Sequence, residues 1–353
     1  MNRQMLDQYR NSLIKEMNTA YQDRIKILLD TNQYINIRKS LYEQWEDNES
    51  EKSVIYKKIF FILKRLVESE IVVCPLTSFV ISEIAKISDD KNFRQETIEI
   101  VSSLSSNCSL NAQFIPMKEK INYFRLENGE SMDLHYQFTP LCMEGATAIR
   151  LPLSTTGYSY HINDEELRNY YREKVFNEDI KSFFARNSLY YHKYAKDVFR
   201  NTFCKRTARE NTLKFNDLLI SNLTNGFQTL SEWYQPNSDT LSSIHKDACL
   251  GKQITKANIK KDINTFRDYT KFHYSLALIF SALYIDKKRK YKKNDFEDIG
   301  NGALSSYIDY YFTEQSFANL LSQGTVELNS LYKVKIKSNP QDILDALNDL
   351  EVQ

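Results

Sequence analysis

The chain has 353 residues, of which 42% are hydrophobic and 26% are charged, and its formal net charge is +1. This balance excludes a disordered chain and supplies enough apolar side chains for a sizeable core, in two domains or in one domain with a large insertion. Because the net charge is close to zero, affinity for a nucleic acid has to come from local clusters of basic side chains.

The cysteines and the apolar segments bear on the compartment. The five cysteines are odd in number and include no C-x-x-C pair, which favours reduced thiols over a disulfide framework or a zinc site. No run of 18 apolar residues exists, and the first 21 residues are charged rather than apolar as in a signal peptide. We therefore expect a soluble, cytoplasmic protein that does not enter a membrane.

The first hundred residues predict alternating helices and strands. Five elements are expected in order: helix 1–23, strand 24–29, helix 51–68, strand 71–74 and helix 76–87. Asp30 directly follows the first strand, and Glu83 lies inside the last helix. Since alternating strands and helices favour a parallel sheet, this region predicts an α/β arrangement.

The pattern changes between residues 101 and 274. Strand patterns become sparse, and helical stretches over 164–184 and 188–210 dominate. Residues 122–162 are less helical, and a hairpin and a long loop both remain open there. We predict that 101–274 is a mostly helical insertion between a first core part (1–100, with the N-terminal helix) and a second core part (275–353).

The α/β pattern returns after the insertion. The expected elements are helix 272–284, strand 310–313, helix 315–322, strand 332–336 and helix 340–350. Asn339 is a suitable N-cap for the last helix, with Pro340 at its first position.

Acidic residues occur at particular points of this pattern. The first strand ends in Leu-Leu-Asp-Thr-Asn (28–32), and Glu83 follows the second strand. Asn-Asp-Phe-Glu-Asp spans 294–298, and Tyr-Ile-Asp-Tyr-Tyr-Phe-Thr-Glu spans 307–314. In this order the phrases resemble the PIN-domain family of metal-dependent nucleases, over about 24–100 and 275–353. The resemblance implies an α/β fold, with a PIN-like core whose central parallel sheet is flanked by helices, plus the mostly α-helical insertion.

The resemblance also implies the site. Asp30, Glu83, Asp298 and Glu314 would be the catalytic, metal-binding acids, with Asn32, Asp295 and Asp309 as auxiliary residues. Mg²⁺ or Mn²⁺ would be the cofactor, because hard cations take oxygen ligands and a pair of them can activate water against a phosphodiester. Without a metal, clustered carboxylates repel one another and their pKa values rise.

Two positions depart from the family pattern, and every acid also has an ordinary interpretation. Thr313 is followed by Glu314 where the family usually has Asp, so this longer side chain is expected to reach a cation through water; Asn301 stands where some relatives have His. The ordinary interpretations are a cap by Asp30 for a helix near Tyr34, a solvated pair of Glu83 with Lys86 or Lys57, first-turn acids at Asp295 and Asp298, and a helix end at Asp309.

Two basic segments indicate nucleic acid. In the first, Lys193, Lys196 and Arg200 share a helix face and alternate with aromatic residues. The second, residues 287–293, contains Lys288, Arg289, Lys290 and Lys292 and ends shortly before Asp295. Basic side chains bind phosphates and aromatic side chains stack on unpaired bases, so both segments predict an RNA contact; a solvated helix and a solvated loop are the alternatives.

These features together predict a function. We expect a phosphodiester hydrolase, an endoribonuclease that cleaves single-stranded RNA with metal-activated water, and DNA is an alternative substrate. A toxin-like or phage-defence role would follow by analogy only. A non-catalytic RNA- or protein-binding module on the same fold is the alternative function. A protein regulator bound by the insertion and a homodimer both remain open.

Overall fold

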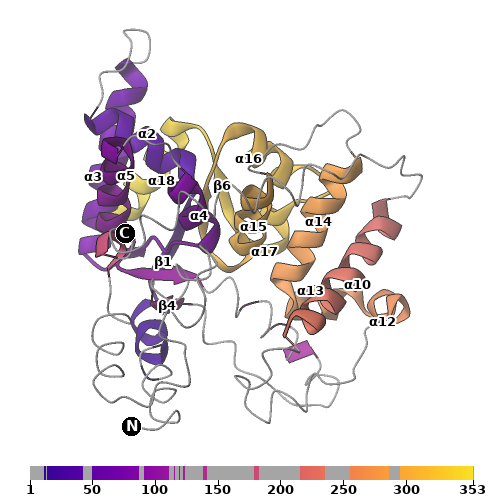
Figure 1. The fold of residues 1–353 in the computed structure, drawn as a ribbon. Helices are drawn as coiled ribbons and strands as arrows, with labels where there is room; N and C mark the ends of the chain where they lie inside the picture. The colour runs from indigo at the N-terminus through magenta and orange to yellow at the C-terminus, as the bar shows by residue number, and fades with distance from the viewer. Residues whose placement is uncertain are drawn as a thin grey trace.

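A computed structural model of the protein describes residues 12, 14–42, 50–86, 91–110, 115, 119, 122–123, 138–140, 179–182, 215–234, 255–285 and 295–352. Within these residues the chain forms a four-stranded parallel sheet with helices on both faces (Figure 1). The α/β class predicted from the alternating pattern is confirmed at this level.

The sheet has the strand order β2-β1-β5-β6. Its strands are β1 (Ile25–Leu29), β2 (Val72–Val73), β5 (Tyr310–Phe312) and β6 (Lys335–Lys337). The chain passes from β1 outward to β2, and later returns to the other side of β1 to form β5 and then β6. The direction of winding therefore reverses between β1 and β5. In open α/β sheets such a switch point is where ligands bind, outside the carboxyl ends of the strands.

Helices account for most of the described chain. They are α2 (Thr31–Tyr42), α3 (Ser50–Glu68), α4 (Ser78–Lys86), α5 (Lys91–Leu104), α10 (Phe215–Tyr234), α12 (Lys256–Lys261), α13 (Ile263–Tyr269), α14 (Lys271–Ile285), α15 (Asp295–Leu304), the 3-10 helix η5 (Ser305–Tyr307), α16 (Gln315–Ser322), α17 (Leu328–Tyr332) and α18 (Pro340–Val352). Residues 14–21, inside the predicted N-terminal helix, are also helical.

The two faces of the sheet bury two different hydrophobic clusters. Ile27 and Leu29 of β1 belong to one cluster with α2, α3, α5 and α18, whereas Leu28 belongs to the other with α14, α15 and α16. In Figure 1 the first group of helices lies on the left and the second on the opposite side of the strands. Because successive side chains of a strand point to opposite faces, a strand covered on both sides reads as a continuous apolar run, as Ile-Leu-Leu does here.

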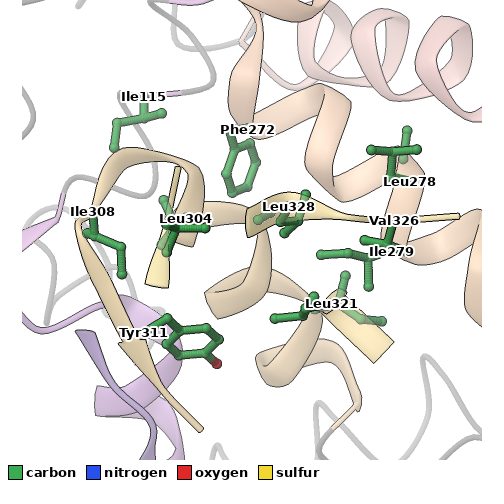
Figure 2. Packing of buried hydrophobic residues seen from close by; sticks show 14 of the residues in the cluster. Ile115, Phe272, Leu278, Ile279, Leu304, Ile308, Tyr311, Leu321, Val326 and Leu328 are labelled. Carbon is green, nitrogen blue, oxygen red and sulfur yellow. The ribbon is translucent and has the colours of Figure 1, made fainter. Parts of the chain in front are cut away.

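The described part of the predicted insertion shares a core with the second half of the chain. Leu223 of α10, Ile259 of α12 and Phe266 of α13 lie in the same buried cluster as Tyr311 of β5, and α10 and α13 pack against α14. Figure 2 shows Phe272, Leu278 and Ile279 of α14 in this cluster with Tyr311. These helices therefore pack on α14 and extend the core on that side of the sheet.

A small antiparallel pair also lies inside 101–274. Strand β3 (Cys108–Leu110) pairs with β4 (Phe138–Pro140), and Ser109 forms a parallel bridge with Leu76, just beyond β2. The Asn18 side chain accepts the Phe138 N–H (3.0 Å) and donates to the Phe138 carbonyl (2.9 Å). This amide occupies the edge of β4 as a neighbouring strand would, which protects an otherwise unpaired edge.

Most predicted elements are confirmed within a few residues, and one is wrong. The structure has β1, α3, α4, α14, β5, α16 and α18 where the sequence predicts them, and Asn339 Oδ1 accepts the Gln341 N–H (2.8 Å) at the start of α18. The predicted strand 332–336 is wrong at its start. Tyr332 ends helix α17, Lys333 has a φ of 60°, and β6 begins only at Lys335. Buried Val334 with Ile336 supplied the alternation, but a left-handed residue cannot continue a strand.

The helices α2 and α5 are not among the elements predicted from the sequence. The alternative interpretation of Asp30 as a cap did assume a helix near Tyr34, where α2 lies. Of the stretch 164–184 only 179–182 is described, and residues 188–210 lie outside the described residues. In the described parts of the chain, no helix combines the length and the apolar composition needed to cross a bilayer.

Candidate functional site

The adjacent parallel strands β1 and β5 end at the same edge of the sheet, and each is followed by a polar residue. Asp30 follows β1, while Thr313 and Glu314 follow β5. The Asp30 N–H donates to the Phe312 carbonyl (2.9 Å), which extends the ladder by one residue. The Thr313 hydroxyl donates to Asp30 Oδ2 (3.0 Å). The predicted first acid is therefore held at the switch point of the sheet.

Asp30 begins helix α2 with its backbone rather than with its side chain. Its carbonyl oxygen accepts the Gln33 N–H (2.9 Å), and Gln33 in turn donates to the Thr313 carbonyl (3.1 Å). The Asp30 side chain is only 1% exposed, and its Oδ1 has no hydrogen-bond partner among the described residues. A buried carboxylate oxygen left without a partner is costly, so capping α2 does not account for this aspartate.

Glu83 approaches the same edge from α4. It is 7% exposed, and its Oε2 accepts a hydrogen bond from the Thr31 hydroxyl (2.5 Å). The interpretation of Glu83 as a solvated partner of a lysine is therefore wrong, because the side chain is buried. Thr31 directly follows Asp30, so its hydroxyl holds the Glu83 carboxyl group of α4 next to the start of α2.

Helix α15 adds acidic residues in its first turn. Asp298 is partly buried, whereas Asp295 and Glu297 are 2% and 1% exposed. Glu314 is partly buried at the N-cap position of α16, with an extended backbone (φ −72°, ψ 154°). We use the name acid cluster for Asp30, Glu83, Asp298 and Glu314, which come from four separate segments of the chain.

The pKa values of three members show that these carboxyl groups influence one another. The pKa of Glu83 is raised to about 9, mainly by burial and also by the charges of Asp30, Asp298 and Glu297, while the Thr31 hydrogen bond lowers it. Burial likewise raises the pKa of Asp298 to about 8, helped by Asp30, Glu314, Asp295 and Glu297. The carboxyl groups therefore lie close enough to repel when ionised.

Asp30 is shifted less because donors surround it. Burial raises its pKa to about 6, while the Thr313 hydroxyl and the backbone N–H groups of Thr31 and Glu314 lower it and the Glu314 charge raises it. Of Asp30, Glu83 and Asp298, Asp30 is thus the one that most readily carries a negative charge at neutral pH.

Tyr311 lies beneath the acid cluster on the second face of the sheet. Burial raises the pKa of its phenol far above the ordinary value, and the charges of Asp30, Asp298 and Glu83 act in the same direction. Figure 2 shows its ring among the apolar side chains of the second cluster. The Tyr311 phenol therefore stays neutral. Its ring is part of the apolar surroundings in which the pKa values of the acids are raised by burial.

Two of the predicted auxiliary residues lie apart from the acid cluster or point to solvent. Asn32 is exposed in the first turn of α2. Asp309 is exposed and precedes β5, at the opposite edge of the sheet; its Oδ2 accepts the Lys26 N–H (2.8 Å), and its carbonyl accepts the Lys335 N–H (2.8 Å). Asp309 therefore joins β1, β5 and β6 at their amino ends, and it does not end a helix.

Of the five histidines, His273 lies in the described part of the chain, and it is a core residue. Its Nδ1 lies 2.8 Å from Glu119 Oε2, and both side chains are almost completely buried. The predicted nucleic-acid-binding residues Lys193, Lys196, Arg200, Lys288, Arg289, Lys290 and Lys292 lie outside the described residues.

The fit of the acid cluster to a divalent cation is mixed. The donors are carboxylate oxygens, as Mg²⁺ and Mn²⁺ require, and Asp30 offers a buried oxygen without a partner. Yet among the described residues no three or more Asp, Glu, His or Cys side chains are arranged so that they could hold a metal ion. The carboxyl groups thus share one edge of the sheet and raise one another's pKa without converging on one ion position.

Sequence reasoning missed three residues that matter to this geometry. Glu297 is buried and raises the pKa of both Glu83 and Asp298, and the hydroxyls of Thr31 and Thr313 hold the carboxylates. For Thr31 and Thr313 the sequence offered a signal, because each lies within two residues of the end of a strand. Glu297 had no such signal, since Glu83, whose pKa it raises, comes from a distant segment of the chain.

Comparisons with known proteins add no relative. Protein-family models, curated proteins and solved structures were each compared with the chain, and none matches it. Function is therefore inferred from the residues of this chain and from their arrangement.

Proposed function

We propose that the protein is a metal-dependent nuclease with a PIN-like core, most specifically an endoribonuclease that cleaves single-stranded RNA. One observation carries the proposal: acids from four distant segments meet at the carboxyl edge of the sheet, where the winding reverses between β1 and β5. Their order along the chain is the order in the family that the sequence resembles. Gathering carboxylates that repel one another costs stability, which a bound cation would offset.

The chain's own residues have distinct roles in this proposal. Asp30, Glu83 and Asp298 would bind the cation, and Glu314 would complete the set through water because its side chain is one methylene longer than aspartate. A divalent cation supplies an activated water and stabilises the departing oxygen of a phosphodiester. Thr313 and Thr31 orient Asp30 and Glu83 through the hydrogen bonds described above.

A metal titration with a matched pair of variants tests the proposal. The purified protein is incubated with 5′-labelled single-stranded RNA, at increasing Mg²⁺ or Mn²⁺ and with a chelator. We expect cleavage that requires metal and that Asp30→Asn abolishes, since this change removes a charged ligand at nearly constant volume. Asp345→Asn, an exposed acid on α18, is the control and should cleave like wild type.

The same experiment identifies the alternative. RNA that is retarded in a gel but remains intact at every metal concentration would mean a non-catalytic binding module. Cleavage that survives Asp30→Asn would remove the acid cluster from the reaction. Single-stranded DNA of the same sequence, tested in parallel, decides between the two substrates.

A further inference from the structure

Helices α3 and α18 pack side by side over the first hydrophobic cluster. Both run from the carboxyl edge of the sheet toward its amino edge, because α18 begins just after β6 and α3 ends just before β2. Near their carboxyl-terminal ends, the Arg65 guanidinium forms an ion pair with Glu351 (2.6 Å). The two helices are therefore parallel, and this ion pair fixes their relative height.

The exposed face of α3 carries an apolar row beside a basic row. Val54 and Phe61 are 51% and 52% exposed, and they lie seven residues apart in one row of the helix surface. Exposed Lys57 and 44% exposed Lys64 form the next row. Because Arg65 points to α18, the lysine row lies on the edge of α3 that is farther from α18.

The exposed face of α18 is acidic. This helix contains no lysine, arginine or histidine. Asp342 and Asp349 are exposed and also lie seven residues apart in one row. Since Glu351 occupies the edge nearer to α3, this row lies on the farther edge; Asp345 accepts a hydrogen bond from Gln341 within the helix (2.7 Å). The two helices therefore present rows of opposite charge at their outer edges.

The heights of the two rows match. Counted back along each helix from the ion pair that joins them, Lys57 lies eight residues away and Asp342 nine. Lys64 and Asp349 lie one and two residues away. Because a helix rises by about 1.5 Å per residue, each lysine differs in height from the corresponding aspartate by only about one such step.

We propose that the face formed by α3 and α18 is the interface of a symmetric homodimer. A two-fold axis parallel to the helices preserves heights and places α3 of each copy over α18 of the other. The Lys57–Lys64 row of one copy then faces the Asp342–Asp349 row of the second, and the Phe61 ring is withdrawn from water. Exposed ion pairs are individually weak, but the symmetry repeats each of them.

The neighbouring rows of opposite charge favour a second copy over a nucleic acid. A polyanion is attracted by lysines, but here it would also meet the carboxylates of the adjacent helix. A copy of the same chain necessarily carries both rows, at the same spacing and in the order that the axis requires. This inference depends neither on the acid cluster nor on a metal.

Charge reversal with complementation tests the interface. Lys57→Glu with Lys64→Glu makes both rows acidic, and Asp342→Lys with Asp349→Lys makes both rows basic. Each double variant repels its own copies, whereas a 1:1 mixture of the two pairs opposite charges at both halves of the interface. The control is the same charge change at two exposed lysines of α12, Lys256→Glu with Lys261→Glu.

Sedimentation velocity of the full chain over micromolar concentrations measures the dimer, and circular dichroism checks folding. We expect wild type and the control to dimerise, with a Kd that rises with salt. Each double variant should raise the Kd by about tenfold or more, because repulsion replaces attraction at several weak contacts. The mixture should regain the wild-type dimer. Phe61→Ser, which leaves every charge in place, should also weaken it, and it decides the question if a charge variant does not fold.

Three results would overturn the inference. A wild-type protein that stays monomeric at every concentration has no such interface. A dimer whose Kd is unchanged in both double variants and in Phe61→Ser uses another face. A monomer whose affinity for single-stranded RNA falls in Lys57→Glu with Lys64→Glu and rises in Asp342→Lys with Asp349→Lys would make the lysine row a polyanion contact.

Discussion

The buried carboxyl groups of Glu119 and Asp30 differ in how many hydrogen bonds they accept. Glu119 is 0% exposed and accepts hydrogen bonds from the N–H groups of Phe272 and His273, from His273 Nδ1 (2.8 Å) and from the Tyr307 hydroxyl. Asp30 is 1% exposed, yet its Oδ2 accepts only the Thr313 hydroxyl as a side-chain donor, and its Oδ1 has no partner among the described residues.

The difference teaches which carboxylate serves the fold. Glu119 satisfies the first N–H groups of α14 and a histidine, so it stabilises the junction of α14 and η5. Burial raises the pKa values of Asp30 and Glu83 instead, and the charges of neighbouring acids, Glu314 for Asp30 and chiefly Asp30 for Glu83, act in the same direction. A satisfied buried carboxylate contributes to folding, whereas a crowded one costs stability and is expected to have a use.

The largest effect should come from Glu83→Gln in the acid cluster. Loss of a charged ligand should reduce RNA cleavage by about 10³-fold, since a bound metal supplies several kcal/mol of charge stabilisation and each 1.4 kcal/mol is tenfold. The metal-free variant should unfold at the same or a higher urea concentration than wild type, because a repelling carboxyl group is gone. Slower cleavage with a clear loss of stability would contradict the comparison with Glu119.

The opposite pattern is expected at Glu119. Glu119→Ala leaves His273, the Tyr307 hydroxyl and two backbone N–H groups buried without their acceptor, which should lower the free energy of unfolding by about 3 kcal/mol or more. Glu119→Gln keeps one acceptor oxygen and should be milder. Urea unfolding monitored by circular dichroism measures both. Equal stability of Glu119→Ala and wild type would show that the hydrogen bonds to Glu119 do not stabilise the junction of α14 and η5.

The pH dependence of stability should show the crowding of the acid cluster. The pKa values of Asp30, Asp298 and Glu83 are raised to about 6, 8 and 9 in the folded protein, from 3.8, 3.8 and 4.5. Between about pH 4 and pH 9 the folded state therefore holds more protons than the unfolded state, so stability falls as pH rises. Without metal, the urea midpoint should be lower at pH 8.5 than at pH 5.5.

A variant and added metal test whether the acid cluster causes this pH dependence of stability. Glu83→Gln should reduce the difference between the two midpoints, and Mn²⁺ should raise the midpoint mainly at pH 8.5, where the carboxylates are ionised. If the difference in urea midpoint between pH 5.5 and pH 8.5 is the same in wild type and in Glu83→Gln, other groups cause the pH dependence.

The smallest effect is expected at Glu314. If this carboxylate acts through water, Glu314→Gln should slow cleavage by only about tenfold, in the range typical of outer residues, and higher Mg²⁺ should restore most of the rate. Glu314→Asp should retain activity. Initial rates against Mg²⁺ concentration measure both variants. Full activity of Glu314→Gln at every concentration would remove Glu314 from the acid cluster and make buried Glu297 the next residue to replace.

Much of the fold was predictable because its signals are local. The apolar run before Asp30, the helical spacing over α3 and α14, and the Asn339–Pro340 start of α18 each depend on neighbours within a few residues. The strand predicted over 332–336 failed where a local pattern was ambiguous, since Tyr332 and Val334 suit a strand and a helix end equally. Asp309 shows the same limit, because its position before β5 sends it to the amino edge of the sheet.

The sequence by itself determined the alternating strands and helices, the position of Asp30 after the first strand and the acidic start of α15. Only the tertiary structure decided which acids meet. Strand order places the carboxyl ends of β1 and β5 side by side, and helix packing brings α4 against α15 with Thr77 bound to Asn301. These contacts join residues more than 200 positions apart, and local spacing carries no information about them because they depend on how the buried faces of whole elements pack together.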